Sequence, residues 1–557
     1  MPCTNVRARK PPGPRALRKK TLKHIEDMNA RNSVSEQPPR SIHPLTINLN
    51  LLIPFLSIYN KLFYSVWPIV SVHRLVAQII GDDNSSPIPN ILNDFTITPT
   101  VGSSARSESL GSHCSVSGDS TNGQESPLNT ENVPNSDIPI TNTNCKACCL
   151  AYSICAAIRC QILFVLKTPE DLVVPKEISA QSFANQARMI MSRFNFWQKP
   201  SIESTLSLFF LYAHYTNVDG QYNRGVIYLR EAITQIQILQ LAMKRKNFAS
   251  IATAEMHEFC KAYYVLLVTE RYACIEGGIP VLLESNLPLP DLENEENPKS
   301  IEDFRELVKI FAIPNKLFFD ILLGNRNELS SFEYLYYPLP SYIKDLQDAL
   351  SNVVVFDNTP DLQKLNIILS KYWMKLVAWR VAHESEMLDG NLDLRSVLSH
   401  YYPIKIAEEF LEAQKNIHVS AYELNGPGVC AKLYEITNAL SMLIKEVLPA
   451  ERHNHYELIT SLLKLVNNFG VAFLLDFSKK FAAVVAYNDE LVDQDKMENF
   501  FKSELMLNLN QLQYDIKLPP RSERDSEKNG YSNFKDTALQ SSRLSEEQII
   551  ESRHFTA

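Results

Sequence analysis

Apolar residues recur every three or four positions over most of this chain, and that spacing predicts amphipathic α-helices. The breaks between them contain the expected residues, such as Gly277 and Gly278 before Pro280. Glycine accepts the left-handed conformation after a helix, and proline prevents its continuation. No fixed-period repeat is found, which argues against a tandem helical array. The predicted helices span 144–167, 177–196, 201–217, 221–247, 254–276, 301–324, 340–355, 361–385, 403–417, 428–447, 455–468 and 470–488.

The pattern therefore predicts an all-α fold class, with one large helical domain over 144–510. A shorter apolar segment, 45–80, is predicted to form the first helices of the same domain, with a break near Pro68. Charged residues such as Lys61 and Arg74 interrupt this segment, and no run of about 20 apolar residues is left. We therefore expect no membrane span.

Three polar segments flank these helices. Residues 81–143 are rich in Ser, Asn, Thr, Pro and Gly and show no hydrophobic period. Such a segment cannot bury enough apolar surface to offset its ordering entropy. The sequence predicts a disordered, acidic linker over 81–143, a mostly disordered basic arm over 1–44 and a mobile tail over 511–557.

One predicted helix is apolar on nearly all sides. The stretch Phe259–Cys274 has few polar positions, which indicates a helix buried in the core. Its Glu270 and Arg271 would then need partners inside the fold, because a buried charge is stable only when it is paired.

Composition supports a globular, helical protein. The 557 residues are 45% hydrophobic and 21% charged, which excludes a mainly disordered or fibrous chain. Only 16 residues are glycine, and glycine costs about 1 kcal/mol relative to alanine inside a helix.

Charge is distributed unevenly along the chain. Residues 1–25 hold eight cations and no carboxylate, although the whole chain has a net charge of −8. A short cationic arm of this kind adds salt-sensitive, sequence-independent affinity for DNA phosphates, or is read by the nuclear import machinery. A solvated tail without either role remains an alternative. The candidate residues for phosphate contact or import are Arg7, Arg9, Lys10, Arg15, Arg18, Lys19 and Lys20.

Ten cysteines are too few for a disulfide scaffold, and no signal peptide is recognised, which favours a reducing compartment. Cys145, Cys148 and Cys155 have the C-x2-C-x6-C spacing of half a binuclear zinc cluster, but no second pair follows and the residues between them are apolar. Cys149 and Cys160 lie in the same stretch and complete a group of five cysteines. We predict that all five are buried structural thiols and that the chain itself binds no metal.

Catalytic signatures are not recognised in the sequence. It contains no G-x-S-x-G, Walker loop, G-x-G-x-x-G or H-E-x-x-H motif. His383 and Glu384 begin the last of these motifs, but Met387 stands where the second histidine would be. His453 and His455 form an H-x-H in a polar stretch that is more typical of a solvated helix start than of a metal site. The chain is predicted not to be an enzyme and to need no cofactor of its own.

Several motifs occur in order between residues 45 and 450. Together they resemble the middle homology region of fungal binuclear-zinc-cluster transcription factors, in the group typified by maltose, starch and quinate regulators. The segments that carry the resemblance are Leu51–Leu75 with Trp67-Pro68, Thr205–Leu241 with Tyr228-Leu-Arg-Glu-Ala-Ile, Tyr264–Pro280 with Thr269-Glu270-Arg271, Trp373–Trp379, Tyr402-Pro403 and Tyr422–Ile436.

The N-terminal sequence resembles the segment that comes directly after the zinc cluster in that family. Cys3 and Thr4 precede the basic segment, as the final cysteine of the cluster would. The other cysteines of the cluster are not in this sequence, and Cys3 alone cannot bind two zinc ions. Two explanations remain open: an upstream segment supplies the cluster and its zinc, or direct base readout has been lost.

The resemblance implies a nuclear transcription regulator of carbon-source (sugar) utilisation genes. Its helical domain would couple a signal to a transcriptional output, which requires two states with different affinities for an effector. Its partners would be DNA and transcriptional co-regulators. The formation of a homodimer is compatible with such a regulator. The alternative is a helical co-regulator or interaction scaffold without a zinc cluster and without direct DNA binding. No pocket residue is predicted, because the sequence contains no ligand-binding motif.

Overall fold

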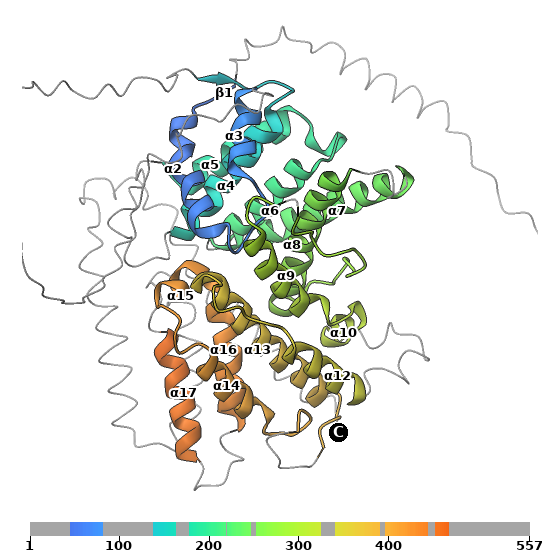
Figure 1. Cartoon of the computed structure of the whole chain (residues 1–557), viewed down its shortest axis with the longest axis vertical. Coiled ribbons are helices and arrows are strands. Elements are labelled where there is room, and N and C mark those ends of the chain that lie inside the picture. The colour runs from blue at the N-terminus through green and yellow to red at the C-terminus, as the bar shows by residue number, and fades with distance from the viewer. Residues whose placement is uncertain are drawn as a thin grey trace, which may run out of the picture.

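The computed structural model describes residues 45–81, 137–162, 178–218, 220–246, 252–293, 295–324, 340–389, 396–443 and 452–466. This part of the chain contains fifteen α-helices and one two-stranded sheet (Figure 1), so the predicted all-α class is confirmed. The basic arm, residues 82–136 of the predicted linker, the predicted helix 470–488 and the predicted tail lie outside the described residues.

The N-terminal half of the domain packs around a first hydrophobic core (Figure 1, blue to green). The central helix of this half is α4, which packs against α2, α3, α5 and α6. The elements of this half are α2 (Leu49–Ile58), the π-helical turn η1 (Tyr59–Phe63), α3 (Val72–Ile80), α4 (Cys145–Ile162), α5 (Ala180–Arg193), the 3-10 turn η2 (Phe196–Gln198), α6 (Ile202–Thr216), α7 (Tyr222–Lys246), α8 (Thr253–Gly277), α9 (Pro298–Ala312) and α10 (Lys316–Leu322).

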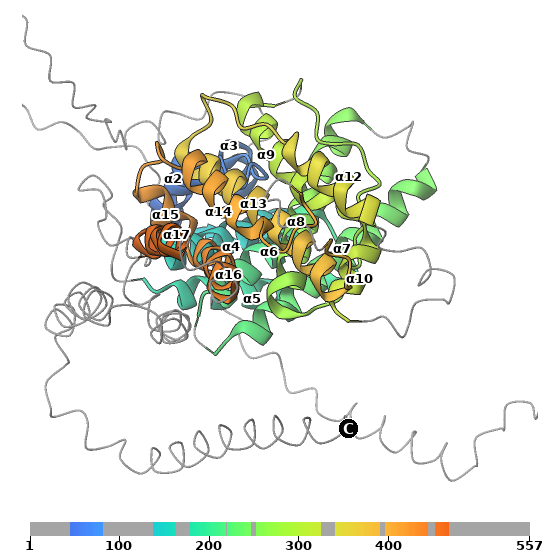
Figure 2. The same cartoon turned by 90° about the horizontal axis from the view of Figure 1, so that it is seen from below.

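The C-terminal half packs around a second core beneath the first, and in Figure 2 its helices lie in front of α4 and α6. One helix belongs to both cores: α13 places Trp373 and Val377 in the first and Leu376 and Trp379 in the second. The helices of this half are α12 (Pro340–Ser351), α13 (Asp361–Glu384), α14 (Tyr402–Ala413), α15 (Ser420–Asn425), α16 (Pro427–Leu443) and α17 (Arg452–Val466).

Local sequence explains several helix ends. A capping box begins α6, because Ser204 N–H donates to Ser201 Oγ over 3.3 Å and Ser201 N–H donates to Ser204 Oγ over 2.9 Å. At the C-terminal end of α8, Gly278 adopts a left-handed conformation with φ 66°. The glycine pair before Pro280 predicted this helix end.

The first helical segment is more divided than predicted. Residues 45–80 form α2, η1 and α3, with the break at Pro68. The Tyr59 hydroxyl donates to the Trp67 carbonyl over 2.6 Å and thereby fixes the turn between η1 and α3.

The chain is also ordered earlier than predicted before α4. Residues 137–143 were assigned to the linker, but β2 (Ile138–Pro139) pairs antiparallel with β1 (Thr46–Ile47). Asn144 Nδ2 supports this pair by donating to the carbonyl oxygens of Ile79 and Pro139. The pairing joins positions far apart in sequence, which a local pattern does not show.

Two further predictions in the helical domain were wrong in detail. The single helix predicted over 301–324 is divided into α9 and α10 at Pro314, after which Asn315 Oδ1 caps α10 by accepting from Phe318 N–H over 3.0 Å. The six-residue helix α15 was not predicted, because a single turn and a half is too short to show a period.

α4 is long and apolar enough to cross a membrane, and it is the one such helix among the described residues. Of its 18 residues, 83% are buried inside the protein, which is typical of a core helix. The expectation of no membrane span stays a prediction.

The buried charges of α8 have the partners that the sequence required. Glu270 accepts from Arg230 Nη1 over 2.8 Å and from the backbone N–H groups of Leu282 and Leu283 over 2.9 and 2.8 Å. Arg271 Nη1 donates to the carbonyl oxygens of Phe311 and Pro314. Both charges are therefore paired or hydrogen-bonded, as predicted.

Candidate ligand-binding pocket

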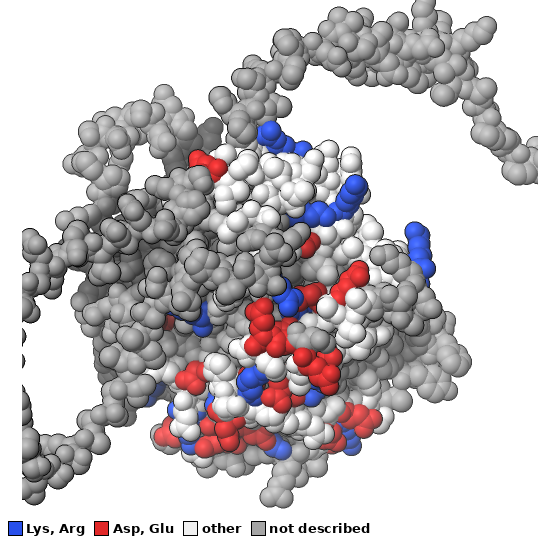
Figure 3. All heavy atoms as spheres, turned by 45° about the horizontal axis from the view of Figure 1, so that its top comes forward, with Lys and Arg blue, Asp and Glu red and all other residues white. Residues whose placement is uncertain are grey.

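One face of the helical body offers little support for phosphate binding. On the face drawn in Figure 3, the Asp and Glu side chains of the described residues gather in a patch, whereas Lys and Arg side chains are scattered. The predicted phosphate-contact residues Arg7, Arg9, Lys10, Arg15, Arg18, Lys19 and Lys20, together with Cys3, lie outside the described residues and stay predictions.

The five clustered cysteines are buried on α4, as predicted. Their thiols face carbonyl oxygens: Cys149 Sγ lies 3.5 Å from Ala187 O, and Cys155 Sγ lies 3.7 Å from Leu52 O. Burial raises the pKa of Cys149 to about 12, so this thiol stays protonated at neutral pH. Cys149 and Cys155 face two different helices, α5 and α2, and among the described residues no three cysteines bring their thiols close enough to share one ion, so this group does not fit a binuclear zinc cluster.

The H-x-H stretch differs from its prediction. His455 is buried, at 8% exposure, whereas a solvated helix start was expected. The reason is helical geometry: Ile459 and Leu462 follow at spacings of four and seven on the same face of α17, and both belong to the second core. The side chain of His453 lies outside the described residues.

A second group of possible ligands lies where α8 meets the loop before α9. Oxygen or nitrogen atoms of His257, Glu258 and Glu295 lie within 4.8 Å of one another. Lys261 already occupies this group, with its Nζ 3.2 Å from Glu258 Oε1 and hydrogen-bonded to Glu295. An ammonium group in this place neutralises the carboxylates that a metal ion would need, so the cluster is best explained as an ion-pair network.

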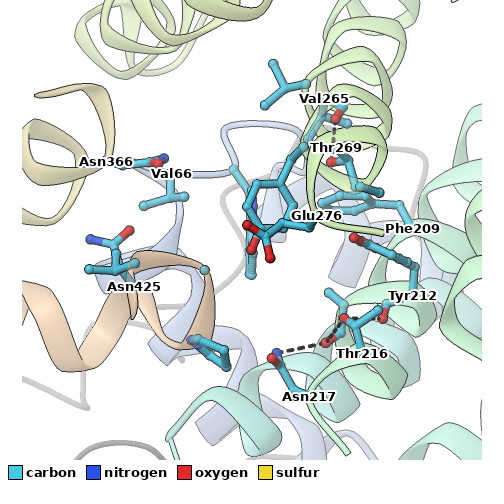
Figure 4. Close-up of a pocket in the computed structure, with 18 of the residues that line it drawn as sticks. Val66, Phe209, Tyr212, Thr216, Asn217, Val265, Thr269, Glu276, Asn366 and Asn425 are labelled. Carbon is cyan, nitrogen blue, oxygen red and sulfur yellow. Dashed lines mark hydrogen bonds between the residues drawn. The ribbon is translucent and has the colours of Figure 1, made fainter. Parts of the chain in front are cut away.

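A pocket of about 280 Å³ lies between the two cores (Figure 4). Its walls come from α4, α6 and α8 on the N-terminal side and from α13, α15 and α16 on the C-terminal side. Aromatic side chains supply much of the wall, and amide or hydroxyl groups stand among them. The aromatic residues are Trp67, Phe209, Tyr212, Tyr222, Tyr272, Phe304 and Phe311, and the amide and hydroxyl residues are Gln161, Thr216, Asn217, Thr269, Asn366 and Asn425.

The polar groups of the pocket lie on opposite sides. In Figure 4, Asn366 and Asn425 lie on one side of the cavity, Thr216 and Asn217 lie on the other, and Glu276 lies between them. Glu276 and Tyr222 are exposed, so they mark the open part of the pocket. A bound molecule could therefore contact both halves of the domain at once.

Lys432 of α16 is the cation of the pocket wall, and it is buried. Its Nζ donates to Ser370 Oγ over 2.8 Å and lies 5.5 Å from the ring centroids of Tyr272 and Trp373. Burial lowers the pKa of Lys432 to about 8, although the carboxylate of Glu276 acts in the opposite direction. The ammonium is therefore held mainly by a hydroxyl group and by aromatic faces.

One side chain connects the two halves beside the pocket. Gln161 Nε2 of α4 donates to Leu424 O at the end of α15 over 2.8 Å, and Gln161 Oε1 accepts from Asn217 Nδ2 over 3.3 Å. Gly426 follows with φ 70°, and a Cβ atom there would lie 2.2 Å from Gln161 Nε2. Glycine is needed at this position both for the backbone angle and for the close approach of the amide.

Four of the six segments that carry the family resemblance converge on this pocket. Trp67, Tyr212, Tyr272 and Lys432 come from four of those segments, and all four line the cavity. No pocket residue was predicted, because these positions are scattered along the chain and form no motif by themselves. The fold and the pocket together define an all-helical domain with a cavity of small-molecule size between two cores.

Comparison with known proteins agrees with the resemblance. The chain is 29% identical over 438 residues to a probable sucrose utilization protein of Candida albicans, a match that covers 79% of this chain and 72% of the relative. It is 29% identical over 211 residues to a maltose fermentation regulatory protein of Saccharomyces cerevisiae, covering 38% of this chain and 42% of that protein. A respiratory transcription factor of the same yeast is 27% identical over 187 residues, which cover 33% of this chain and 38% of the relative.

No family model and no solved structure matches the chain. The chain spans less than half the length of these two Saccharomyces cerevisiae relatives. The names of the three relatives nevertheless confirm the predicted resemblance: this chain is similar to fungal transcription regulators and to a sugar utilization protein.

Proposed function

We propose that this protein regulates the transcription of sugar-utilisation genes in the nucleus, and that the pocket between the two cores is its effector site. The observation that carries the proposal is that four segments in which the chain resembles the fungal regulators meet at one cavity. The names of the relatives, which refer to sucrose utilization and maltose fermentation, support a sugar-related signal.

The wall of the pocket is chemically suited to a hydroxylated ring. Aromatic faces such as Trp67 and Tyr272 pack against apolar ring surfaces, and amides such as Asn366 can both donate to and accept from hydroxyl groups. An apolar cavity with a few convergent polar groups is the usual form of a small-molecule site.

Regulation follows from the position of the pocket. A molecule that contacts α6 and α8 on one side and α15 and α16 on the other binds best when these walls are close together. It therefore stabilises one arrangement of the two halves relative to any other, and such differential affinity is what coupling to an output requires.

DNA contact is assigned to the basic arm. Its cations would bind phosphates independently of the base sequence, because phosphate contacts carry no sequence information by themselves. The same arm would serve nuclear import. Zinc takes part only if a cluster completed by Cys3 exists upstream.

The effector site is tested by ligand-dependent stability of the full chain. A ligand at one hundred times its Kd raises the free energy of unfolding by about 2.7 kcal/mol. Maltose, sucrose and glucose, as well as acidic sugars, should be screened by thermal unfolding, with Thr269→Val and Asn366→Leu as pocket variants. A shift that both variants abolish supports the proposal, and the absence of a shift with every probe contradicts it.

The DNA contact is tested by retention on duplex DNA at increasing salt. The full chain should be retained at low salt, and a variant lacking residues 1–25 should not. Equal behaviour of the two would support the alternative, a helical co-regulator or interaction scaffold without direct DNA binding.

A further inference from the structure

The buried lysines of the described residues differ in their partners. Three lysines are buried among the described residues: Lys261, Lys375 and Lys432. Lys261 pairs with Glu258 and Glu295, and Lys375 Nζ lies 3.7 Å from Glu409 Oε2. Around Lys432, by contrast, no carboxylate oxygen of the described residues lies within 4.0 Å of Nζ.

This difference is energetically unfavourable for the protein by itself. A buried ammonium without a counter-charge is destabilising unless hydrogen bonds and aromatic faces compensate. Lys432 donates one hydrogen bond, to Ser370 Oγ, and can donate two more. The surrounding rings of Tyr272, Phe311 and Trp373 offer only their faces, at 5.5 to 6.0 Å.

The carboxyl group of the pocket wall, that of Glu276, lies in the open part of the pocket. Glu276 is exposed and Lys432 is buried, so the pocket has an acidic entrance and a basic interior. The field of Glu276 opposes the entry of an anion, but water at the entrance screens it. A ligand with one anionic group and no other charged group fits this arrangement best.

We propose that the pocket binds a small hydroxylated molecule with one anionic group, a carboxylate or a phosphate, held by the ammonium group of Lys432. The inference rests on the proposed function and names the chemical class of its effector. A volume of about 280 Å³ is near the lower limit of ligand pockets, which indicates a compact molecule such as a sugar acid or a sugar monophosphate.

The test compares matched neutral and anionic probes by calorimetry on the full chain at pH 7. Glucose is compared with gluconate and glucose 6-phosphate, and maltose and sucrose are measured in parallel. We expect at least one anionic probe to bind tenfold or more tightly than glucose. Lys432→Met should remove that advantage and should change the affinity for neutral sugars less than twofold.

A control variant separates a local contact from a general charge effect. Lys344 is exposed on α12, and Lys344→Met changes the net charge by the same amount as Lys432→Met without touching the pocket. It should leave the anionic advantage intact. Thermal unfolding of Lys432→Met, expected at or above the wild-type temperature, shows that a loss of binding is not a loss of folding.

The possible outcomes distinguish the inference from the proposed function. If a neutral sugar binds as tightly as its anionic counterparts and Lys432→Met affects both equally, the inference is wrong and the effector site stands. If both charge variants reduce anion binding to the same extent, the inference is also wrong, because Lys432 then has no special role. If none of the probes binds, both the inference and the effector site are contradicted.

Discussion

Arg230 of α7 donates a hydrogen bond to the buried carboxylate of Glu270 of α8, with 2.8 Å between Nη1 and Oε1. The two residues belong to two of the segments that carry the resemblance to fungal regulators, Thr205–Leu241 and Tyr264–Pro280, and the first of these is the most specific match. The pair joins two core helices, and the same carboxylate also accepts from the backbone N–H groups of Leu282 and Leu283 after α8.

Glu270→Ala should destabilise the protein by about 3–5 kcal/mol, because it leaves Arg230 without its carboxylate and two backbone N–H groups without an acceptor. Urea unfolding at pH 7 measures the change. Glu408→Ala, on the exposed face of α14, is the control and should stay within about 0.5 kcal/mol of the wild type. An equal effect of the two substitutions would contradict the role assigned to the pair.

Lys432→Met should stabilise the unliganded protein at pH 7, by about 1–4 kcal/mol, because it removes a buried charge that lacks a carboxylate partner. The pKa of Lys432 is lowered from 10.5 to about 8, so the folded protein releases this proton more readily than the unfolded chain does. The wild type therefore gains stability as the pH rises from about 8 to 10.5. The advantage of the variant should be largest at pH 7 and should shrink at pH 9.5, as measured by urea unfolding at both values.

Gly426→Ala should destabilise the protein more than Gly81→Ala. Both glycines have a positive φ, and an alanine there costs about 1–3 kcal/mol in backbone strain. At Gly81 the added Cβ atom meets nothing within 4 Å, whereas at Gly426 it displaces the Gln161 amide from Leu424 O. The lost buried hydrogen bond adds about 1–3 kcal/mol. Equal unfolding midpoints for the two variants would show that the Gln161 contact is unimportant.

Glu295→Gln should reduce the stability of the protein at neutral pH and flatten its acid dependence. Burial raises the pKa of the Glu295 carboxyl, but hydrogen bonds from Lys261 and His257 outweigh it, so the pKa is lowered overall. A lowered pKa gives stability that is fully present above the unfolded value of about 4.5 and is lost as the pH falls through the folded value. Unfolding midpoints between pH 3 and 7 should therefore converge for wild type and variant at the acidic end. A constant difference over this range would contradict the assignment.

Sequence periodicity predicted the helices well where they are long and amphipathic, and Gly278 marked the end of α8 correctly. It could not predict the pairing of Thr46 with Pro139, because two residues so far apart in the chain share no local pattern. The division at Pro314 was visible in the sequence but was outweighed by the apolar period on both sides of it. The burial of His455 was not predicted because its neighbours in the sequence are polar. The apolar residues on the same face of α17, which belong to the second core, come only later in the helix.

The pocket could not be predicted for a different reason. Its wall is assembled from single residues of several helices, so that Trp67 and Lys432 meet only after both cores have formed. The family resemblance indicated which segments matter, but not that they surround a cavity. Among the described residues Lys432 has no carboxylate within ion-pair distance. This property likewise depends on distances in the folded protein, which the sequence alone does not give.

α13 gives this protein a mechanical property that neither half would have alone. Trp373 and Trp379 lie less than two turns apart on this helix, and each is buried in a different core. Unfolding of one core would remove the packing from one side of α13 and would thereby destabilise the other core. The two halves should therefore denature in a single cooperative step.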